Sequence, residues 1–301
     1  MRIGILVPSI GSFGQKGFYN LQEVGLAKAL DAYCEKVRVW RLIPKSATFS
    51  VEKIDGCKNS MVEFLPSKQI GTNGIVDFSK LDNELDVLLC FADTQLAIPA
   101  IYKWTKKNSI FFLPYIGVVE SHSTSKMKQM VMDTLFARNL NVYKKNHCLT
   151  KTLAVSRNLK KMGVEHITLA PVGLDLTLLN NDYYNCNATK LKQKYGYRAE
   201  DKVLLFIGRL IDEKQPLKMI EIFSELLGKQ ENYKLLIVGT GELKDTVNAV
   251  IQKNAIKGNV QMIDRIPNSD IWELYRFVEA FINLNQQEIF GMAILEAMYY
   301  G

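Results

Sequence analysis

The sequence predicts an α/β protein built from two doubly wound, Rossmann-like domains. The chain has 301 residues, a length that suits two domains of ordinary size. Apolar runs of strand length alternate with amphipathic stretches of helical length. Many of these runs are rich in Val, Ile and Leu and lack polar alternation, as in parallel strands buried on both faces. We expect both sheets to direct their carboxyl ends to one cleft, because ligands of doubly wound sheets bind at that end.

The first domain is expected over residues 1–180 and the second over residues 181–301, with the polar segment Asn180–Ala199 as the hinge. The expected strands are Ile3–Val7, Val37–Leu42, Val62–Leu65, Val87–Phe91, Ile110–Leu113, Thr152–Val155, Thr168–Ala170, Val203–Ile207, Lys234–Val238, Val260–Ile263 and Ala280–Asn283. The expected helices are Leu21–Ala32, Leu96–Lys107, Lys126–Lys144, Pro216–Leu227, Leu243–Lys253 and Met292–Tyr300.

Composition excludes several classes of protein. With 48% hydrophobic and 23% charged residues, the chain is not of the disordered type. It has no apolar window of about 18 residues, so no membrane-spanning helix is expected, and its start lacks a secretory cleavage site. The five cysteines are scattered without C-x-x-C spacing, which favours a reducing, cytoplasmic compartment and argues against a metal site.

The positive charge is concentrated in the first domain. Residues 1–180 carry 23 Lys and Arg against 15 Asp and Glu, whereas residues 181–301 carry 15 against 16. The segment 121–164 alone has nine basic residues and one acid, Asp133. Such a surplus indicates an anionic partner. Nucleic acid is not expected, because the basic residues are not interleaved with aromatic ones and no recognition motif is present.

Within this basic segment, the helical stretch 126–138 carries an apolar stripe, for which two interpretations remain open. The stripe either faces the core of the domain or lies on an anionic lipid surface, where each basic residue adds about 1 kcal/mol of attraction. The residues of the stripe are Met127, Met130, Val131, Leu135 and Phe136.

Two cations follow the first strand of the second domain. The strand runs into Gly208-Arg209, and Lys214 comes five residues after the arginine, just before Pro216 at a helix start. Arg offers a planar fork and Lys a point charge, so the pair suits a diphosphate at the carboxyl edge of the sheet. The alternative is a solvated basic pair on a loop.

A second candidate site precedes and enters the last helix. Gly291 permits close approach of a ligand to the backbone, and the amides around Ile289, Phe290 and Met292 offer an anion site at the helix start. Glu296 follows in the second turn, where its carboxylate can accept from a pair of hydroxyls. Glu288, before the helix, could reach another hydroxyl. The alternative is an acidic loop with a surface glutamate.

Two glycine turns complete the set of motifs. Gly239 and Gly241 follow a strand and precede a helix, but Lys244 stands where the dinucleotide fingerprint needs a third glycine. The turn therefore permits close approach to a nucleotide and is weak evidence for nicotinamide binding. The other turn, Pro171–Asp175, is expected to be structural and to lead out of the first domain.

These motifs, in this order and spacing, resemble the retaining nucleotide-sugar glycosyltransferases of family 4 (group 1), which have the GT-B architecture. The resemblance is strong over residues 150–301, where Gly208–Lys214 and the Glu-x7-Glu pair stand, and Pro171–Asp175 resembles the family's Pro-Asn-Gly-Val-Asp turn. In the first domain it depends on a glycine loop, Gly14–Gly17, before a helix.

The resemblance implies roles for these residues. Arg209 and Lys214 would bind the donor diphosphate, Glu296 the ribose hydroxyls, and Glu288 with the amides of residues 290–292 the donor sugar. The donor would be a UDP- or GDP-sugar, with no other cofactor and no metal, since cations and N–H donors stabilise the leaving diphosphate. The backbone around Asp264–Ile266, with Arg265, would contact the base.

Two departures from the family pattern qualify these roles. Relatives carry a cleft histidine in the first domain; here either His122 takes that place, or Gly117 does and the histidine is missing, with Glu120 as another candidate. His147 and His166 are expected to be structural or solvated. The chain ends at Gly301, just after the helix of Glu296, so we expect the second domain to be C-terminally truncated, with weak or no activity.

The function expected from this resemblance is hexosyl transfer to an acceptor hydroxyl in polysaccharide or glycolipid synthesis, by an enzyme in the cytoplasm or on the inner face of the cell membrane. The acceptor would be a glycan or a lipid-linked molecule. One alternative is a non-catalytic subunit that binds sugar nucleotides. The other, a dinucleotide oxidoreductase, is disfavoured by the missing third glycine.

Overall fold

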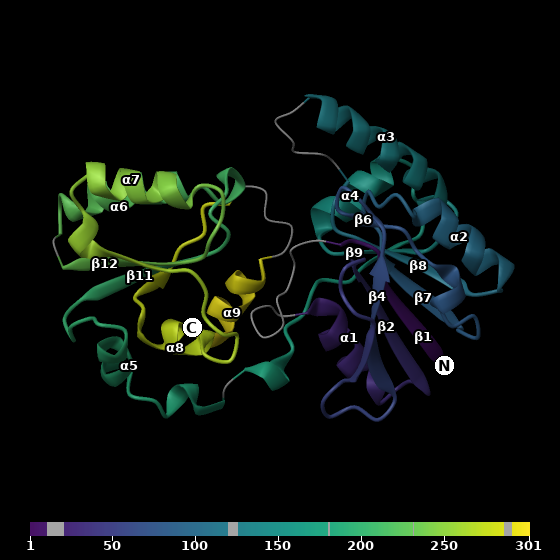
Figure 1. Cartoon of the computed structure of the whole chain (residues 1–301), viewed down its shortest axis with the longest axis horizontal. Coiled ribbons are helices and arrows are strands. Elements are labelled where there is room, and N and C mark those ends of the chain that lie inside the picture. The colour runs from purple at the N-terminus through teal and green to yellow at the C-terminus, as the bar shows by residue number, and fades with distance from the viewer. Residues whose placement is uncertain (11–20, 120–125, 180, 231, 286–290) are drawn as a thin grey trace. The chain divides into compact units, whose positions relative to one another are not determined.

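The computed structural model describes residues 1–10, 21–119, 126–179, 181–230, 232–285 and 291–301 (Figure 1). The chain divides into two compact units, the first ending at Gly173 and the second beginning at Leu174. The division therefore falls inside the turn Pro171–Asp175 and before the boundary predicted at residue 180. Each unit is built on its own sheet.

The first unit contains an eight-stranded sheet in the order β10-β9-β8-β7-β1-β2-β4-β3. All described pairs are parallel except β3 with β4. A two-stranded hairpin, β5 (Gln69–Ile70) with β6 (Asn73–Gly74), lies outside this sheet. The strands of the sheet are β1 (Arg2–Val7), β2 (Lys36–Pro44), β3 (Ser50–Lys53), β4 (Ser60–Ser67), β7 (Val87–Phe91), β8 (Phe111–Ile116), β9 (Cys148–Thr150) and β10 (Ile167–Leu169).

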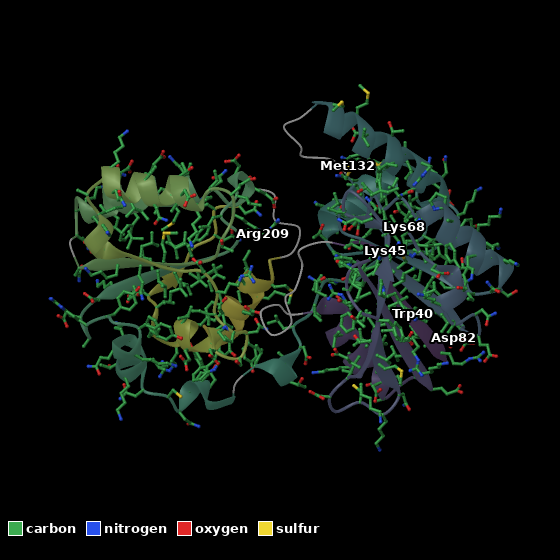
Figure 2. The ribbon with its side chains drawn as sticks, viewed as in Figure 1. Trp40, Lys45, Lys68, Asp82, Met132 and Arg209 are labelled. Atoms are coloured by element: carbon green, nitrogen blue, oxygen red, sulfur yellow. The ribbon has the colours of Figure 1, made fainter. Side chains whose placement is uncertain are left out.

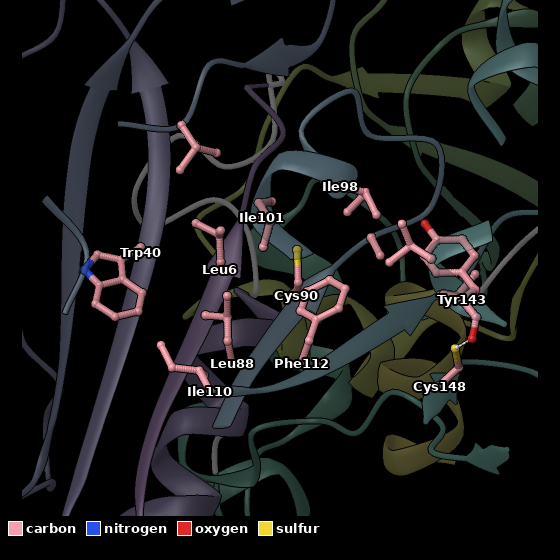
Figure 3. Packing of buried hydrophobic residues seen from close by; sticks show 14 of the residues in the cluster. Leu6, Trp40, Leu88, Cys90, Ile98, Ile101, Ile110, Phe112, Tyr143 and Cys148 are labelled. Carbon is pink, nitrogen blue, oxygen red and sulfur yellow. Dashed lines mark hydrogen bonds between the residues drawn. The ribbon is translucent and has the colours of Figure 1, made fainter. Parts of the chain in front are cut away.

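Helices cover the two faces of this sheet. On one face, α1 (Gln22–Asp31) contacts β2 and β4. On the other, α2 (Ile98–Lys107), α3 (Lys126–Tyr143) and α4 (Leu153–Lys161) close a core that Figure 3 shows from nearby. Cys90 and Phe112 face this core from neighbouring strands, and the thiol of Cys148 donates to the carbonyl of Tyr143 at 3.5 Å. Because helices cover both faces, the strands of this sheet are buried on both sides, which accounts for their continuous apolar runs.

One predicted strand of the first unit is wrong. Residues Thr152–Val155 do not continue the sheet, because the strand is β9 and the chain turns into α4 directly after it. The hydroxyl of Thr152 accepts a hydrogen bond from the amide of Val155 at 3.2 Å and so caps that helix. The β-branched residues that indicated a strand here are a helix cap and a core-facing helical valine.

The second unit contains a four-stranded parallel sheet in the order β13-β12-β11-β14. The strands are β11 (Lys202–Ile207), β12 (Tyr233–Val238), β13 (Val260–Ile263) and β14 (Ala280–Phe281). Leu204 and Phe206 pack with the helices α6 (Pro216–Leu227) and α7 (Lys244–Lys253), whereas Val203 and Leu205 pack with α8 (Ile271–Phe277) and α9 (Met292–Tyr300). Figure 1 shows α6 and α7 on one side of this sheet and α8 and α9 on the other. The sheet is therefore doubly wound.

The segment predicted as a hinge belongs to the second unit. Residues 188–194 form α5 (Ala188–Lys194), which Asn187 caps by accepting from the amides of Thr189 and Lys190. The ammonium of Lys194 pairs with Glu273 of α8 at 2.6 Å. The polar composition that indicated a linker is that of a short solvent-exposed helix. Five 3₁₀ turns complete the described elements: Phe78–Lys80, Leu176–Leu178, Asn181–Tyr184, Asp212–Lys214 and Lys257–Asn259.

Candidate active site

The carboxyl edge of the second unit's sheet is the place where the candidate residues gather. The chain runs β11, β12, β13 in one direction across the sheet and then returns to the other side of β11 with β14. The strand order thus reverses between β11 and β14. In open parallel sheets, ligands bind outside the carboxyl ends of the strands at such a reversal.

The turn after β11 carries the two predicted cations. Arg209 is exposed on this turn (Figure 2), and the amide of the next residue, Leu210, donates to the carbonyl of Thr240 at 3.0 Å. Lys214 ends the 3₁₀ turn Asp212–Lys214. Gln215 then adopts the left-handed conformation, with φ 53° and ψ 46°, before Pro216 starts α6. Both cations therefore stand on one short, backbone-anchored turn at the carboxyl edge.

The turn after β14 meets the turn after β11. The side-chain amide of Asn285 donates to a carboxylate oxygen of Glu213 at 3.4 Å, which joins the two flanks of the reversal. Gly291 then caps α9 with its backbone alone, in an extended conformation. The first amides of a helix point outward from its start, so this end of α9 can bind an anion. Glu288, Ile289 and Phe290 lie outside the described residues.

Glu296 lies in the second turn of α9 and is buried, with 7% of its surface exposed. Burial raises the pKa of this carboxyl to about 7, while a hydrogen bond from the Tyr275 hydroxyl opposes the shift. That hydroxyl lies 3.4 Å from Oε2 of Glu296 and 3.1 Å from the carbonyl oxygen of Ala293. The sequence indicated Glu296 but gave no sign of its burial or of Tyr275, because α8 was not among the predicted helices.

Gly239 and Gly241 hold the turn after β12 against the turn after β11. A methyl group on Gly239 would overlap the carbonyl oxygen of Gly208, and one on Gly241 would lie 2.7 Å from the carbonyl carbon of Leu210. The close approach that the sequence assigned to a nucleotide is thus made, in this structure, by neighbouring backbone. Lys244, in place of a third glycine, pairs with Asp264 at 2.7 Å.

We expect Gly239→Ala to destabilise the second unit by about 3 kcal/mol or more, because backbone must move to accommodate the new methyl group. Urea unfolding followed by circular dichroism measures this loss. Gly258→Ala is the matched control, since a methyl group there meets no atom within 4 Å. Equal stabilities of the two variants would contradict this account of the turn.

The remaining predicted residues are spread over both units. Arg265 is exposed after β13, at the same carboxyl edge as Arg209. His122 and Glu120 lie outside the described residues. Gly117 follows β8, and its amide donates to Oδ1 of Asp93 at 2.6 Å.

Two other histidines and Asp93 belong to the first unit. His147 and His166 stack with their ring centroids 6.4 Å apart, and the His147 ring is hydrogen bonded to Thr168. Asp93 itself stands at the end of β7 with φ 42° and fixes the neighbouring turn, a role that the sequence did not indicate.

The apolar stripe on α3 divides into two parts. Phe136 is buried in the core of the first unit, as the core-facing interpretation requires. Met127, Met130 and Val131, however, are 75%, 70% and 54% exposed, so that interpretation is wrong for the first half of the helix. In the described part of the chain, no helix is both long and apolar enough to cross a bilayer.

Two Rossmann-like sheets, the second with cations and a helix start at its carboxyl edge, have the architecture of GT-B glycosyltransferases. Solved structures confirm this fold. A sucrose-phosphate synthase from Thermosynechococcus elongatus aligns with a TM-score of 0.74 at 13% identity, covering 100% of this chain and 80% of that one. Anabaena HepE in complex with UDP and glucose aligns with a TM-score of 0.67 at 15% identity, covering 99% and 78%.

Residues 187–301 match the family model described as glycosyl transferases group 1. Among curated proteins, the alpha-monoglucosyldiacylglycerol synthase of Acholeplasma laidlawii is 24% identical over 162 residues, which are 52% of this chain and 41% of the relative. The chain spans half or less of the length of three curated relatives that it matches. The resemblance to group 1 glycosyltransferases is thereby confirmed.

Proposed function

We propose that this protein transfers a hexosyl unit from a nucleotide-diphosphate sugar to an acceptor hydroxyl, with retention of anomeric configuration. The observation that carries the proposal is the meeting of the two turns that flank the strand reversal, joined by Asn285 and Glu213. One turn supplies Arg209 and Lys214, and the other leads into the helix of Glu296. A diphosphate and a ribose diol are the groups that this set of side chains recognises.

The chemistry follows from the leaving group. Cleavage of the sugar–phosphate bond develops negative charge on the nucleoside diphosphate. Arg209, Lys214 and the first amides of α9 would stabilise that charge, which is the main catalytic contribution of preorganised cations and N–H donors. In this proposal, no metal ion is needed to stabilise the charge of the leaving diphosphate. Glu296 would accept from the ribose hydroxyls, Glu288 would face the donor sugar, and Arg265 would lie near the base.

Binding and hydrolysis measurements test this proposal in turn. Calorimetry with UDP, GDP, ADP and NAD is expected to show binding of one nucleoside diphosphate and none of NAD; preferential NAD binding would instead favour the oxidoreductase alternative. Release of sugar from the matched nucleotide sugar then separates an enzyme from a subunit that only binds. The HepE complex contains UDP, which makes UDP-glucose the first donor to try.

For the acceptor, we propose a glycan or a lipid-linked molecule in polysaccharide or glycolipid synthesis, used in the cytoplasm or on the inner face of the membrane. The specific observation is the exposed patch of α3 formed by Met127, Met130 and Val131. It lies within the segment 121–164, with its nine basic residues against one acid. Apolar side chains among basic ones are the combination that attaches helices to anionic lipid.

Serine at all three patch residues is expected to weaken binding to phosphatidylglycerol vesicles by about tenfold or more, because apolar area no longer enters the lipid. Vesicle sedimentation measures the effect, with phosphatidylcholine vesicles and added salt as comparisons. Serine at Phe49 and Val51, exposed at β3 of the same unit, is the control. Binding that ignores lipid charge and salt would exclude the membrane proposal.

A further inference from the structure

Among the described residues, the carboxyl of Glu296 receives its hydrogen bond from a different helix. The hydroxyl of Tyr275, on α8, lies 3.4 Å from Oε2 of Glu296. It also lies 3.1 Å from the carbonyl of Ala293, one turn earlier on α9. One tyrosine hydroxyl thus touches both the carboxylate and the helix that carries it.

Tyr275 is itself rigidly held. Its ring stacks on Tyr300 with the centroids 5.7 Å apart and meets Phe281 edge-on at 6.1 Å. Its carbonyl accepts a hydrogen bond from the hydroxyl of Tyr183 at 3.3 Å. The residue is 7% exposed, so it has little freedom to change rotamer. A fixed donor of this kind selects one orientation of the carboxylate that it binds.

We infer that Tyr275 is a positioning residue, which orients the Glu296 carboxylate as an acceptor for the vicinal hydroxyls of the donor's ribose. The inference rests on the proposed function, because it assigns the ribose to Glu296. A carboxylate that must accept from two adjacent hydroxyls needs a fixed plane and the ionised form. Tyr275 contributes to both, since it constrains one oxygen and its hydrogen bond favours the charged state against the larger, opposing effect of burial.

The groups around this carboxyl are consistent with that role. One aromatic cluster contains Tyr275 from α8, Tyr300 from α9 and Tyr183 from the 3₁₀ turn Asn181–Tyr184. The ring centroids of Tyr183 and Tyr300 are 4.6 Å apart. Arg276 lies over the ring of Tyr183, at 5.4 Å from its centroid, and bonds the carbonyl of Cys186. Among the residues that the structure describes, the Tyr275 hydroxyl is therefore the group that is hydrogen bonded to the Glu296 carboxyl and lowers its pKa.

Tyr275→Phe removes the hydroxyl and keeps the ring. Two readouts are expected to change. The pKa of Glu296, followed by ¹³C-carboxyl NMR and assigned with Glu296→Gln, should rise above its wild-type value. The preference for UDP over 2′,3′-dideoxy-UDP, expected to be roughly tenfold in the wild type, should fall to about threefold. A change that merely loosened the fold would weaken both nucleotides equally.

Tyr197→Phe is the matched control. Its hydroxyl is buried without a hydrogen-bond partner, and its ring packs on Phe277 of α8, the helix that carries Tyr275. It should keep both wild-type values. An unchanged Glu296 pKa or an unchanged ribose preference in Tyr275→Phe would overturn the inference, as would a wild type that binds both nucleotides equally. If the wild type binds no UDP at all, the proposed function fails, and the carboxyl titration alone decides whether Tyr275 holds Glu296.

Discussion

Replacing both Arg209 and Lys214 by alanine should lower kcat/KM for sugar transfer or donor hydrolysis by about 10³ or more. Removal of one preorganised donor from a developing oxyanion costs about 10²–10³ in rate, and both cations are proposed to act on the same diphosphate. The loss should appear in kcat as well as in KM, because the charge grows as the sugar–phosphate bond breaks.

Two further variants make this result specific. Arg209→Lys should recover only part of the rate, since the ammonium lacks the planar fork of the guanidinium. Lys218→Ala, an exposed lysine on α6 that pairs with Glu221, should leave the rate unchanged. The unfolding midpoint of each variant, measured alongside the rate, separates a loss of catalysis from a loss of folding. Wild-type rates in the double variant would exclude the turn after β11 from the donor site.

Glu296→Gln should stabilise the protein at pH 8 while it weakens nucleotide binding. The folded-state pKa is raised from 4.5 to about 7 by burial. Between these two values the folded state binds more protons than the unfolded state, so stability falls as the pH rises through this window. The difference between the two pKa values lowers the free energy of unfolding of the wild type by about 3 kcal/mol at high pH. The Glu296→Gln variant has a neutral amide at every pH and is therefore not destabilised in this way.

Unfolding in urea at several pH values measures this effect. The variant and the wild type should have similar stabilities at pH 4 and should diverge up to pH 8. Affinity for UDP should fall by about tenfold or more, because the acceptor for the ribose hydroxyls has lost its charge. Glu225→Gln, at an exposed position on α6, is the control for both measurements. A variant that is no more stable at pH 8 would show that Glu296 is not buried as described.

Much of the fold could be predicted because its signals are local. The buried parallel strand β7 is a continuous apolar run, and its predicted limits agree with the structure. The predicted limits of β13 also agree, although that strand is half-buried and contains Gln261. Helix α6 is marked by Pro216 at its start and by its amphipathic period. The missed elements have weaker local signals. Helices α5 and α8 are only seven residues long, and α5 is polar.

For the candidate site, the sequence by itself determined which chemical groups are available. Spacing after the apolar strands sufficed to place Arg209, Lys214 and the helix of Glu296 at one sheet edge, because parallel strands end together. The tertiary structure decided the rest. In the folded protein, Glu296 is buried and hydrogen bonded to Tyr275, and Gly239 and Gly241 let two backbone turns lie against each other. The apolar residues in the first half of α3 are exposed. Each of these depends on contacts between segments far apart in the chain, and such contacts leave no periodic or local trace in the sequence.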